Sequence, residues 1–251
     1  MLKSTSKSAS GEGSLLGLIK FFSKEEHYLA FQAGMSLFRT PHYYRSLDTP
    51  GRGDRYDSCL GYWNRTLGDT LPELIDQNSF PLEIDLKNAE SLLIHPVEEK
   101  HDSWVQCWSA IGSHNEFENS LERMINEFGK YFVILPPKNI EAYAKIMGCS
   151  RYGLVNYSSD PLKRSLITKD SSFSYQKEFR FFVGQCAKEE VIDKLIKDSS
   201  IKSLLCANAT TIKLSCPSTD KDYFFSQGQE KIIIRPRIAT PPITQFLRDN
   251  D

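Results

Sequence analysis

Apolar side chains recur at two spacings along the chain, and each spacing predicts one kind of element. Spacings of three and four residues between a capping residue and a glycine predict helices, while alternation of apolar and polar residues between turn residues predicts strands. The predicted helices cover about residues 24–33, 115–128, 139–147 and 188–197. The predicted strands cover 35–39, 81–86, 90–94, 103–109, 131–135, 152–157, 176–183, 211–214 and 232–234. This order predicts a domain that mixes helices with a sheet of short strands.

Three segments carry predictions that depend on particular residue types. The first helix begins with the form of a capping box at Ser23–Glu26, and Gly34 is placed to end it. Residues 48–58 contain Pro, two Gly and five charged residues, which is typical of an exposed loop. The predicted helix at 188–197 turns four apolar side chains inward: Val191, Ile192, Leu195 and Ile196.

A row of polar side chains lies on the predicted strand at 176–183. Because side chains alternate between the two faces of a strand, Gln176, Glu178 and Arg180 share one face. Gln176 and Glu178 would then stand about 7 Å apart, near enough to hold one ligand at two points. The alternative is a solvated face on which Glu178 pairs with Arg180, an interaction worth under about 1 kcal/mol. Taken alone, the strand favours the solvated face.

Composition sets limits on this picture. A chain of 251 residues with 40 % hydrophobic residues can bury a large core, and we expect one domain at 15–251 behind a disordered tail at 1–14. Thirty-one basic and 32 acidic residues give a net charge of −1, so no overall field attracts nucleic acid or an anionic membrane. The N-terminal residues lack the apolar stretch of a secretory signal, and no run of 18 apolar residues occurs. These features predict a cytoplasmic protein without membrane contact.

Metal and hydrolase motifs are not recognisable in the sequence. The six cysteines are widely spaced and form no Cys-x-x-Cys pair, so reduced thiols are expected and no metal site is predicted. His95, His101 and Cys107 fall six residues apart, a wider spacing than that of most structural zinc ligands. There is neither a Gly-x-Ser-x-Gly elbow nor a phosphate loop ending in Gly-Lys-Ser/Thr, which argues against the hydrolases that use those motifs.

Three separated motifs carry a resemblance to a known superfamily. Arg39 ends an early strand, Cys107-Trp108-Ser109 lies on a central one, and Gln176-Lys177-Glu178 opens a late one. This set resembles the ADP-ribosyltransferases of the Arg-Ser-Glu type with a Gln-x-Glu motif. Only the last position of their usual Ser-Thr-Ser is matched, by Ser109. The resemblance implies an α+β fold with a mixed or antiparallel split sheet flanked by helices.

The matching stretches are short and lie within the first three quarters of the chain. Ile19–Phe22, Gly34–Arg45 and Tyr175–Arg180 are similar to a group of bacterial transferase-like proteins among which toxins are common. The resemblance therefore implies a toxin or defence protein, with an antitoxin as a possible partner. The C-terminal part adds nothing to it.

The resemblance also implies a cofactor and a role for each matched residue. Such enzymes break the bond between nicotinamide and ribose in NAD through a cation-like transition state. Glu178 would hold the ribose and stabilise the positive charge, an effect worth on the order of 3 kcal/mol, and Ser109 would orient it. Arg39 would bind the phosphates or the adenine-side ribose. Tyr43 or Tyr44 would stack on nicotinamide.

Gln176 bears on the acceptor. In the superfamily, Glu-x-Glu sites tend to modify arginine, whereas Gln-x-Glu sites tend to modify asparagine, a nucleobase or another acceptor. A side-chain amide both donates and accepts, which suits a base edge, so a nucleobase in RNA or DNA is expected ahead of a protein. Basic residues near the strand would either contact the phosphates of such an acceptor or face solvent: Lys163, Arg164, Lys169 and Lys177. An NAD glycohydrolase and an inactive nucleotide- or protein-binding module of the same fold remain alternatives.

Overall fold

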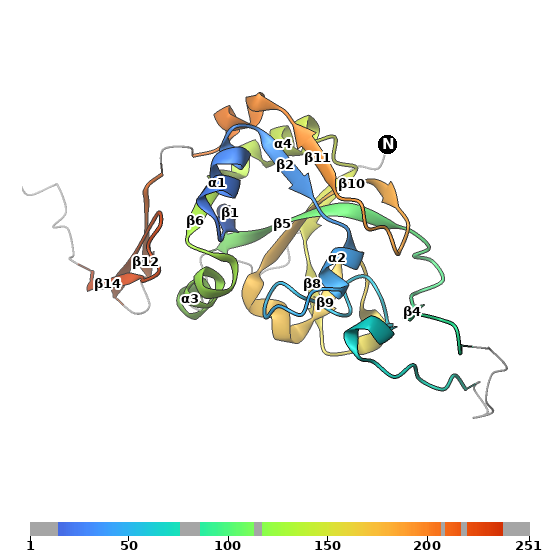
Figure 1. The fold of residues 1–251 in the computed structure, drawn as a ribbon. Coiled ribbons are helices and arrows are strands. Elements are labelled where there is room, and N and C mark those ends of the chain that lie inside the picture. The colour runs from blue at the N-terminus through green and yellow to red at the C-terminus, as the bar shows by residue number, and fades with distance from the viewer. Residues whose placement is uncertain (1–14, 76–85, 113–116, 207–208, 217–219, 238–251) are drawn as a thin grey trace, which may run out of the picture.

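The computed structural model, drawn in Figure 1, describes residues 15–75, 86–112, 117–206, 209–216 and 220–237. Its helices are α1 (Glu25–Gln32), α2 (Pro41–Arg45), α3 (Phe117–Phe128) and α4 (Ile140–Ile146), with 3₁₀ turns at Arg65–Leu67, Pro137–Asn139, Pro161–Lys163, Ser171–Gln176 and Ser199–Leu204. The early strands are β1 (Leu15–Phe22), β2 (Met35–Phe38), β3 (Gly61–Asn64), β4 (Ser91–Ile94), β5 (Asp102–Gly112), β6 (Tyr131–Leu135) and β7 (Arg151–Leu154). The later strands are β8 (Asn156–Ser158), β9 (Thr168–Asp170), β10 (Glu178–Cys186), β11 (Lys194–Lys197), β12 (Thr211–Cys216), β13 (Lys221–Ser226) and β14 (Ile233–Pro236). The predicted α+β class is confirmed.

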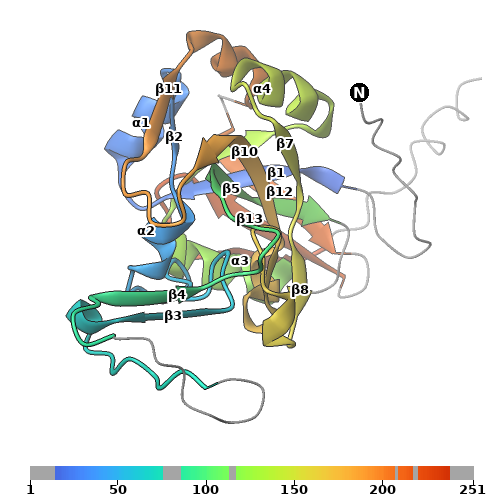
Figure 2. The same cartoon turned by 90° about the vertical axis from the view of Figure 1, so that its right-hand side faces the viewer.

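An antiparallel five-stranded sheet in the order β6-β1-β5-β10-β7 forms the centre of the fold. Helices α1 and α4 cover one face, where Trp108 and Phe181 pack against Tyr143 of α4. Helix α3 and the separate sheet β12-β13-β14 cover the other face, where Ile19 and Phe225 belong to one apolar cluster (Figures 1 and 2). The two clusters are the core that holds the central sheet in place.

The sheet divides beside β5. Strand β1 stays paired with β5 only as far as Ile19, which lies opposite Ser109. Strand β2 reaches β5 through an isolated bridge between Arg39 and Val105, and otherwise pairs with β11. Residues 106–108 therefore have no strand partner on this edge among the described residues. The opening between β1 and β2 is where the fold can admit a ligand.

Three predicted helices are confirmed as α1, α3 and α4. Gly34 and Gly129 end the first two with φ of 102° and 116°, a conformation that favours glycine. The predicted capping box is wrong, because the N-cap of α1 is Lys24 and no side chain caps it. The predicted tail at 1–14 and nearly all of the predicted strand at 81–86 lie outside the described residues.

The predicted helix at 188–197 is wrong. Residues 194–197 form strand β11, and Val191 and Ile192, which were expected to face inward, are 69 % and 70 % exposed. Lys188 is buried instead, with its Nζ 2.8 Å from a carboxylate oxygen of Asp102. A buried ion pair and edge pairing with β2 thus override an apolar pattern that fits a helix.

The loop prediction at 48–58 is wrong for its C-terminal half. Asp54, Asp57 and Ser58 are buried, although Thr49 and Pro50 are exposed as expected. The predicted strand at 152–157 is divided into β7 and β8. The strands near 211–214 and 232–234 belong to the separate three-stranded sheet rather than closing the central one. In the part of the chain that the structure describes, no helix has the length and apolar character needed to cross a bilayer.

Candidate functional site

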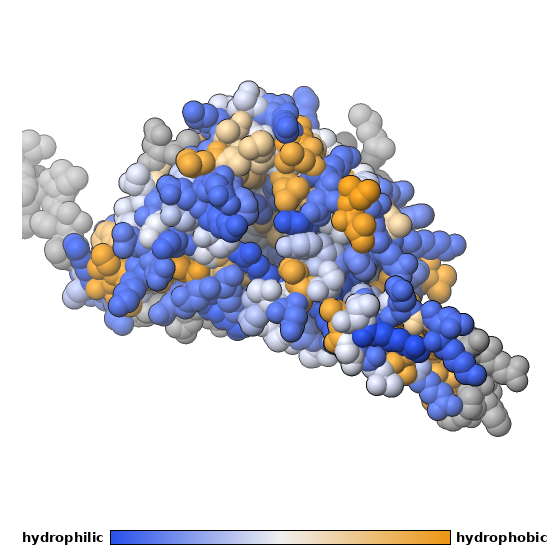
Figure 3. Space-filling view, viewed as in Figure 1, coloured by the Kyte–Doolittle hydropathy of each residue, from blue (hydrophilic) through white to orange (hydrophobic). Residues whose placement is uncertain are grey.

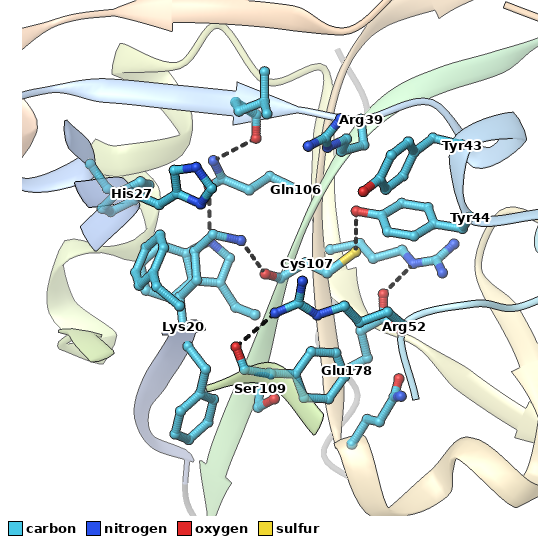
Figure 4. Close-up of a pocket in the computed structure, with 18 of the residues that line it drawn as sticks. Lys20, His27, Arg39, Tyr43, Tyr44, Arg52, Gln106, Cys107, Ser109 and Glu178 are labelled. Carbon is cyan, nitrogen blue, oxygen red and sulfur yellow. Dashed lines mark hydrogen bonds and ion pairs between the residues drawn. The ribbon is translucent and has the colours of Figure 1, made fainter. Parts of the chain in front are cut away.

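A cleft of about 510 Å³ lies at the opening between β1 and β2 (Figure 4). Figure 3 shows this face of the molecule hollowed near its centre, with apolar residues above the hollow. Pockets of about 300–1,000 Å³ hold ligands the size of nucleotides and drugs. All six predicted site residues line the cleft: Arg39, Tyr43, Tyr44, Ser109, Gln176 and Glu178. The structure thus brings together side chains that are up to 139 positions apart, counted from Arg39 to Glu178 (178 − 39 = 139).

Helix α2 places the two tyrosines. Thr40 accepts a hydrogen bond from the backbone N–H of Tyr43 at 3.1 Å, and Pro41 occupies the first turn, so the strand turns directly into the helix. The guanidinium of Arg39 lies 3.9 Å from the centre of the Tyr43 ring and forms an ion pair with Asp193. Arg39 lines the cleft as predicted, but its charge already has a partner.

Gln176 lies just outside the strand on which it was predicted. It ends a 3₁₀ turn, and Lys177, with φ of 45°, redirects the chain before β10 begins at Glu178. The side-chain amide of Gln176 donates to the carbonyl of Gly51 at 2.7 Å and accepts from Lys169 at 3.3 Å. Its hydrogen-bonding groups therefore hold the 48–58 loop in this conformation. The predicted role of Gln176 in selecting the acceptor stays a prediction.

Glu178 is 4 % exposed and bound to two cations. Its Oε1 accepts a hydrogen bond from Arg180 Nε at 2.6 Å, and its Oε2 lies 3.1 Å from Lys169 Nζ. The Lys169 contact is an ion pair without hydrogen-bond geometry, so Oε2 accepts no hydrogen bond from the described residues. Burial would raise the pKa of Glu178, but Arg180 and then Lys169 outweigh it and hold the pKa well below its usual range. Glu178 is thus a carboxylate at neutral pH, and its buried Oε2 accepts no hydrogen bond from the described residues.

Ser109 is opposite Glu178 in the β5–β10 register, but the structure shows no hydrogen bond between the two described side chains. Cys107, which was not predicted, lies on the same face of β5 near Glu178 and is among the groups that lower its pKa. Burial, followed by the Glu178 charge, raises the pKa of the Cys107 thiol to about 12. The thiol also lies 3.7 Å from the hydroxyl of Tyr44. The orienting role predicted for Ser109 therefore stays a prediction, and the bond that fixes Oε1 of Glu178 comes from Arg180.

Five buried charged residues form what we term the floor cluster: Asp54, Asp57, Lys169, Glu178 and Arg180. Two nitrogens of Arg180 bind the two oxygens of Asp57 at 2.8 Å each, and Lys169 lies 3.4 Å from Asp54. The prediction of a solvated face for Arg180 is therefore wrong, as is that of solvent exposure for Lys169, while a nucleic-acid contact by Lys169 stays a prediction. The cluster holds three carboxyl groups and two cations, and burial raises the pKa of Asp54.

A second set of buried charged residues holds the 48–58 loop in place: Arg45, Asp102 and Lys188. Arg45 donates to the carbonyl of Asp57 at 2.7 Å and lies 3.4 Å from Asp102. Lys188 also bonds to Asp102, and it donates to the carbonyl of Ser58 at 2.9 Å. These contacts fix the part of the loop that carries Asp57 into the floor cluster.

Two further cations line the cleft and are termed the wall pair: Lys20 and Arg52. Lys20 Nζ donates to the carbonyl of Cys107 at 2.9 Å, in the gap where β5 has no strand partner. Arg52 donates to the carbonyl of Phe128 at 2.9 Å. Neither was predicted as a site residue, although Lys20 lies in one of the stretches that carry the resemblance. No feature of the sequence placed either beside Glu178.

Comparison of the chain with protein-family models, with curated proteins and with solved structures gives no match. Among the described residues, no group of three or more His, Cys, Asp or Glu side chains is arranged to hold a metal ion.

Proposed function

We propose that the chain is an NAD-dependent mono-ADP-ribosyltransferase that uses Glu178 as its catalytic carboxylate. The observation that carries the proposal is the state of this residue: it is buried at the floor of a nucleotide-sized cleft, ionised, and has one oxygen without a hydrogen-bond donor. A ribose hydroxyl can donate to that oxygen. As the bond to nicotinamide breaks, the ribose gains positive charge, which a fixed carboxylate stabilises more than it stabilises the neutral sugar.

The charge of the floor cluster supports the same chemistry. Arg180 and Lys169 pair with Glu178, but they pair with Asp57 and Asp54 as well, so two cations are shared among three carboxyl groups. Arg180 and Lys169 position the Glu178 carboxylate. Because Asp57 and Asp54 share these cations, the negative potential at Glu178 is not cancelled. NAD approaches such a floor with its positively charged nicotinamide end. Tyr43 and Tyr44 line the same cleft and offer ring faces for stacking.

The enzyme is expected to transfer ADP-ribose to an acceptor other than arginine, with a nucleobase in RNA or DNA ahead of a protein side chain. Action as a bacterial toxin, controlled by an antitoxin, belongs to the same proposal. An NAD glycohydrolase would use Glu178 in the same way, with water as the acceptor. An inactive nucleotide-binding module is favoured by a separate observation, that Glu178 has two cationic partners and no bond to Ser109.

The test compares the protein with Glu178→Gln and with Glu141→Gln, an exposed matched change on α4. Each is incubated with labelled NAD and either cell protein or RNA and DNA. We expect Glu178→Gln to lower nicotinamide release by about 100- to 1,000-fold and Glu141→Gln to leave it unchanged. Nuclease should remove label from the products if a nucleobase is the acceptor. Equal NAD consumption by Glu178→Gln and wild type would refute the catalytic role.

Retained binding of ADP by Glu178→Gln establishes that its cleft is folded. A wild-type protein that binds ADP but consumes no NAD would support the inactive module instead. Nicotinamide release without a labelled acceptor would support the glycohydrolase. Slower growth on expression in bacteria, relieved by Glu178→Gln, would indicate a toxin.

A further inference from the structure

The wall pair differs from every other lysine and arginine that lines the cleft. Arg39, Lys169 and Arg180 each form an ion pair with a carboxylate. Lys20 and Arg52 form none with the described residues, and each donates only to a backbone carbonyl. Two cations without a counter-charge are costly beside a partly enclosed cavity, so an anionic ligand would relieve an unfavourable charge there.

Both residues have donors to spare. An ammonium group has three N–H donors and a guanidinium has five, of which the carbonyls of Cys107 and Phe128 take one each. Figure 4 shows Lys20 entering the cleft from β1 and Arg52 from the loop that follows α2, with Cys107 drawn between their labels. Both side chains line the same cleft, and burial and then the charge of Arg52 lower the pKa of Lys20 to about 8.

We propose that Lys20 and Arg52 form the subsite that binds the diphosphate of a nucleotide, an inference that rests on the proposed function. The spare donors of the pair match phosphate oxygens, and the guanidinium can bind two of them at once. Arg39, the residue expected to bind phosphates, is held by Asp193. The cleft then has a cationic wall and an anionic floor. NAD carries the opposite charges in its diphosphate and its nicotinamide end, so the wall pair also sets the direction in which NAD enters.

The experiment measures the binding of ADP and of adenosine by calorimetry at pH 7, because the two ligands differ only in the diphosphate. The variants are Lys20→Met, Lys20→Arg and Arg52→Gln, with Lys145→Met as a control that removes one exposed lysine charge on α4. We expect wild type and Lys145→Met to bind ADP more tightly than adenosine. Lys20→Met and Arg52→Gln should each lose about tenfold or more in ADP affinity and little in adenosine affinity, and Lys20→Arg should retain most of the preference.

A second measurement records the uptake of protons when ADP binds at different pH values. Since Lys20 must be charged to hold phosphate, ADP affinity should fall from pH 7 to pH 9, with proton uptake on binding near pH 8 that Lys20→Met abolishes. The groups that face Lys20 are Cys107, Arg52, Glu178 and Arg39. The raised pKa of Cys107 and the lowered pKa of Glu178 keep both from titrating in this range.

The outcomes separate this inference from the proposed function. An unchanged ratio of ADP to adenosine affinity in Lys20→Met and Arg52→Gln would overturn the subsite, even if Glu178→Gln abolishes NAD cleavage. Loss of the preference for ADP over adenosine in those variants supports the subsite, even if NAD is never cleaved. Binding of a single-stranded oligonucleotide that depends on Lys20, with ADP affinity unchanged in all variants, would assign the pair to an acceptor and also overturn the proposal.

Discussion

The floor cluster and the wall pair line the same cleft, but their charges are arranged in different ways. In the floor cluster each charged side chain contacts at least one of opposite sign, and the contacts reach back to Asp57 in the loop. Lys20 and Arg52 form no ion pair with the described residues, and each donates a hydrogen bond only to a carbonyl oxygen. Removing one member of a paired group leaves its partner buried and unpaired, whereas removing an uncompensated charge relieves a cost. Substitutions in the floor cluster should therefore destabilise the protein, whereas substitutions in the wall pair should be tolerated.

The largest expected effect comes from breaking the floor cluster at Asp57. Asp57→Asn leaves the buried guanidinium of Arg180 with a neutral partner, and we expect a loss of about 3–5 kcal/mol in the free energy of unfolding. Urea titration followed by circular dichroism measures it. Glu230→Gln removes an exposed ion pair with Lys130 and should cost under about 1 kcal/mol. Similar losses in the two variants would mean that the floor cluster is no more than a set of surface pairs.

The stability of the floor cluster should also depend on pH through Glu178. Its pKa is lowered in the folded protein, so the unfolded chain binds more protons in acid and stability falls as the pH drops below about 4.5, the ordinary value. Above that pH the contribution is complete. Between pH 3 and pH 7 the free energy of unfolding should therefore rise by up to about 2 kcal/mol more for wild type than for Glu178→Gln, as urea titrations at each pH would measure. Parallel curves would show that Glu178 has an ordinary pKa.

The sequence predicts the elements of this site better than it predicts the partners within it. Strand β5 and helix α3 follow from local spacing, because the apolar residues of each element recur at the spacing that places them on the face that packs in the core. The charged residues of 48–58 were expected in solvent, since composition cannot distinguish a solvated carboxylate from one that Arg180 will bury. For the same reason the strand taken alone paired Glu178 with Arg180 correctly but favoured a solvated face for both.

The helix predicted at 188–197 shows the same limit for apolar residues. Its spacing fits a helix, yet the interaction that decides the structure is the bond from Lys188 to Asp102, 86 positions earlier. The family resemblance, by contrast, brought Arg39, Ser109 and Glu178 to one cleft because it relates distant positions, which local periodicity cannot do. It carried no information about Cys107 or the wall pair, whose positions result from this chain's own packing.

A substitution in the wall pair is expected to have a smaller effect of opposite sign, a gain in stability. Lys20→Met removes a charge without a carboxylate partner and keeps a side chain that packs near Phe22 and Trp108, so it should stabilise the protein by about 2 kcal/mol at pH 7. The folded-state pKa of about 8 is below the usual 10.5, so the native protein releases its proton first and wild type gains stability between those values. The advantage of Lys20→Met should shrink over that range in thermal unfolding. Destabilisation at pH 7 would show that the bond to Cys107 outweighs the buried charge.

The smallest expected effect tests whether Arg39 can join the wall pair once it is released. Asp193→Asn removes the carboxylate that holds Arg39 and leaves a neutral side chain of the same shape. The pair is partly exposed, so stability should change by under about 1 kcal/mol, while ADP should bind up to about fivefold more tightly because a third cation becomes available. Glu189→Gln makes the same charge change at an exposed position of the same segment and should leave ADP affinity as it was. Weaker ADP binding by Asp193→Asn would mean that Asp193 holds Arg39 in its binding position, so that the ion pair completes the wall of the cleft instead of competing with the ligand.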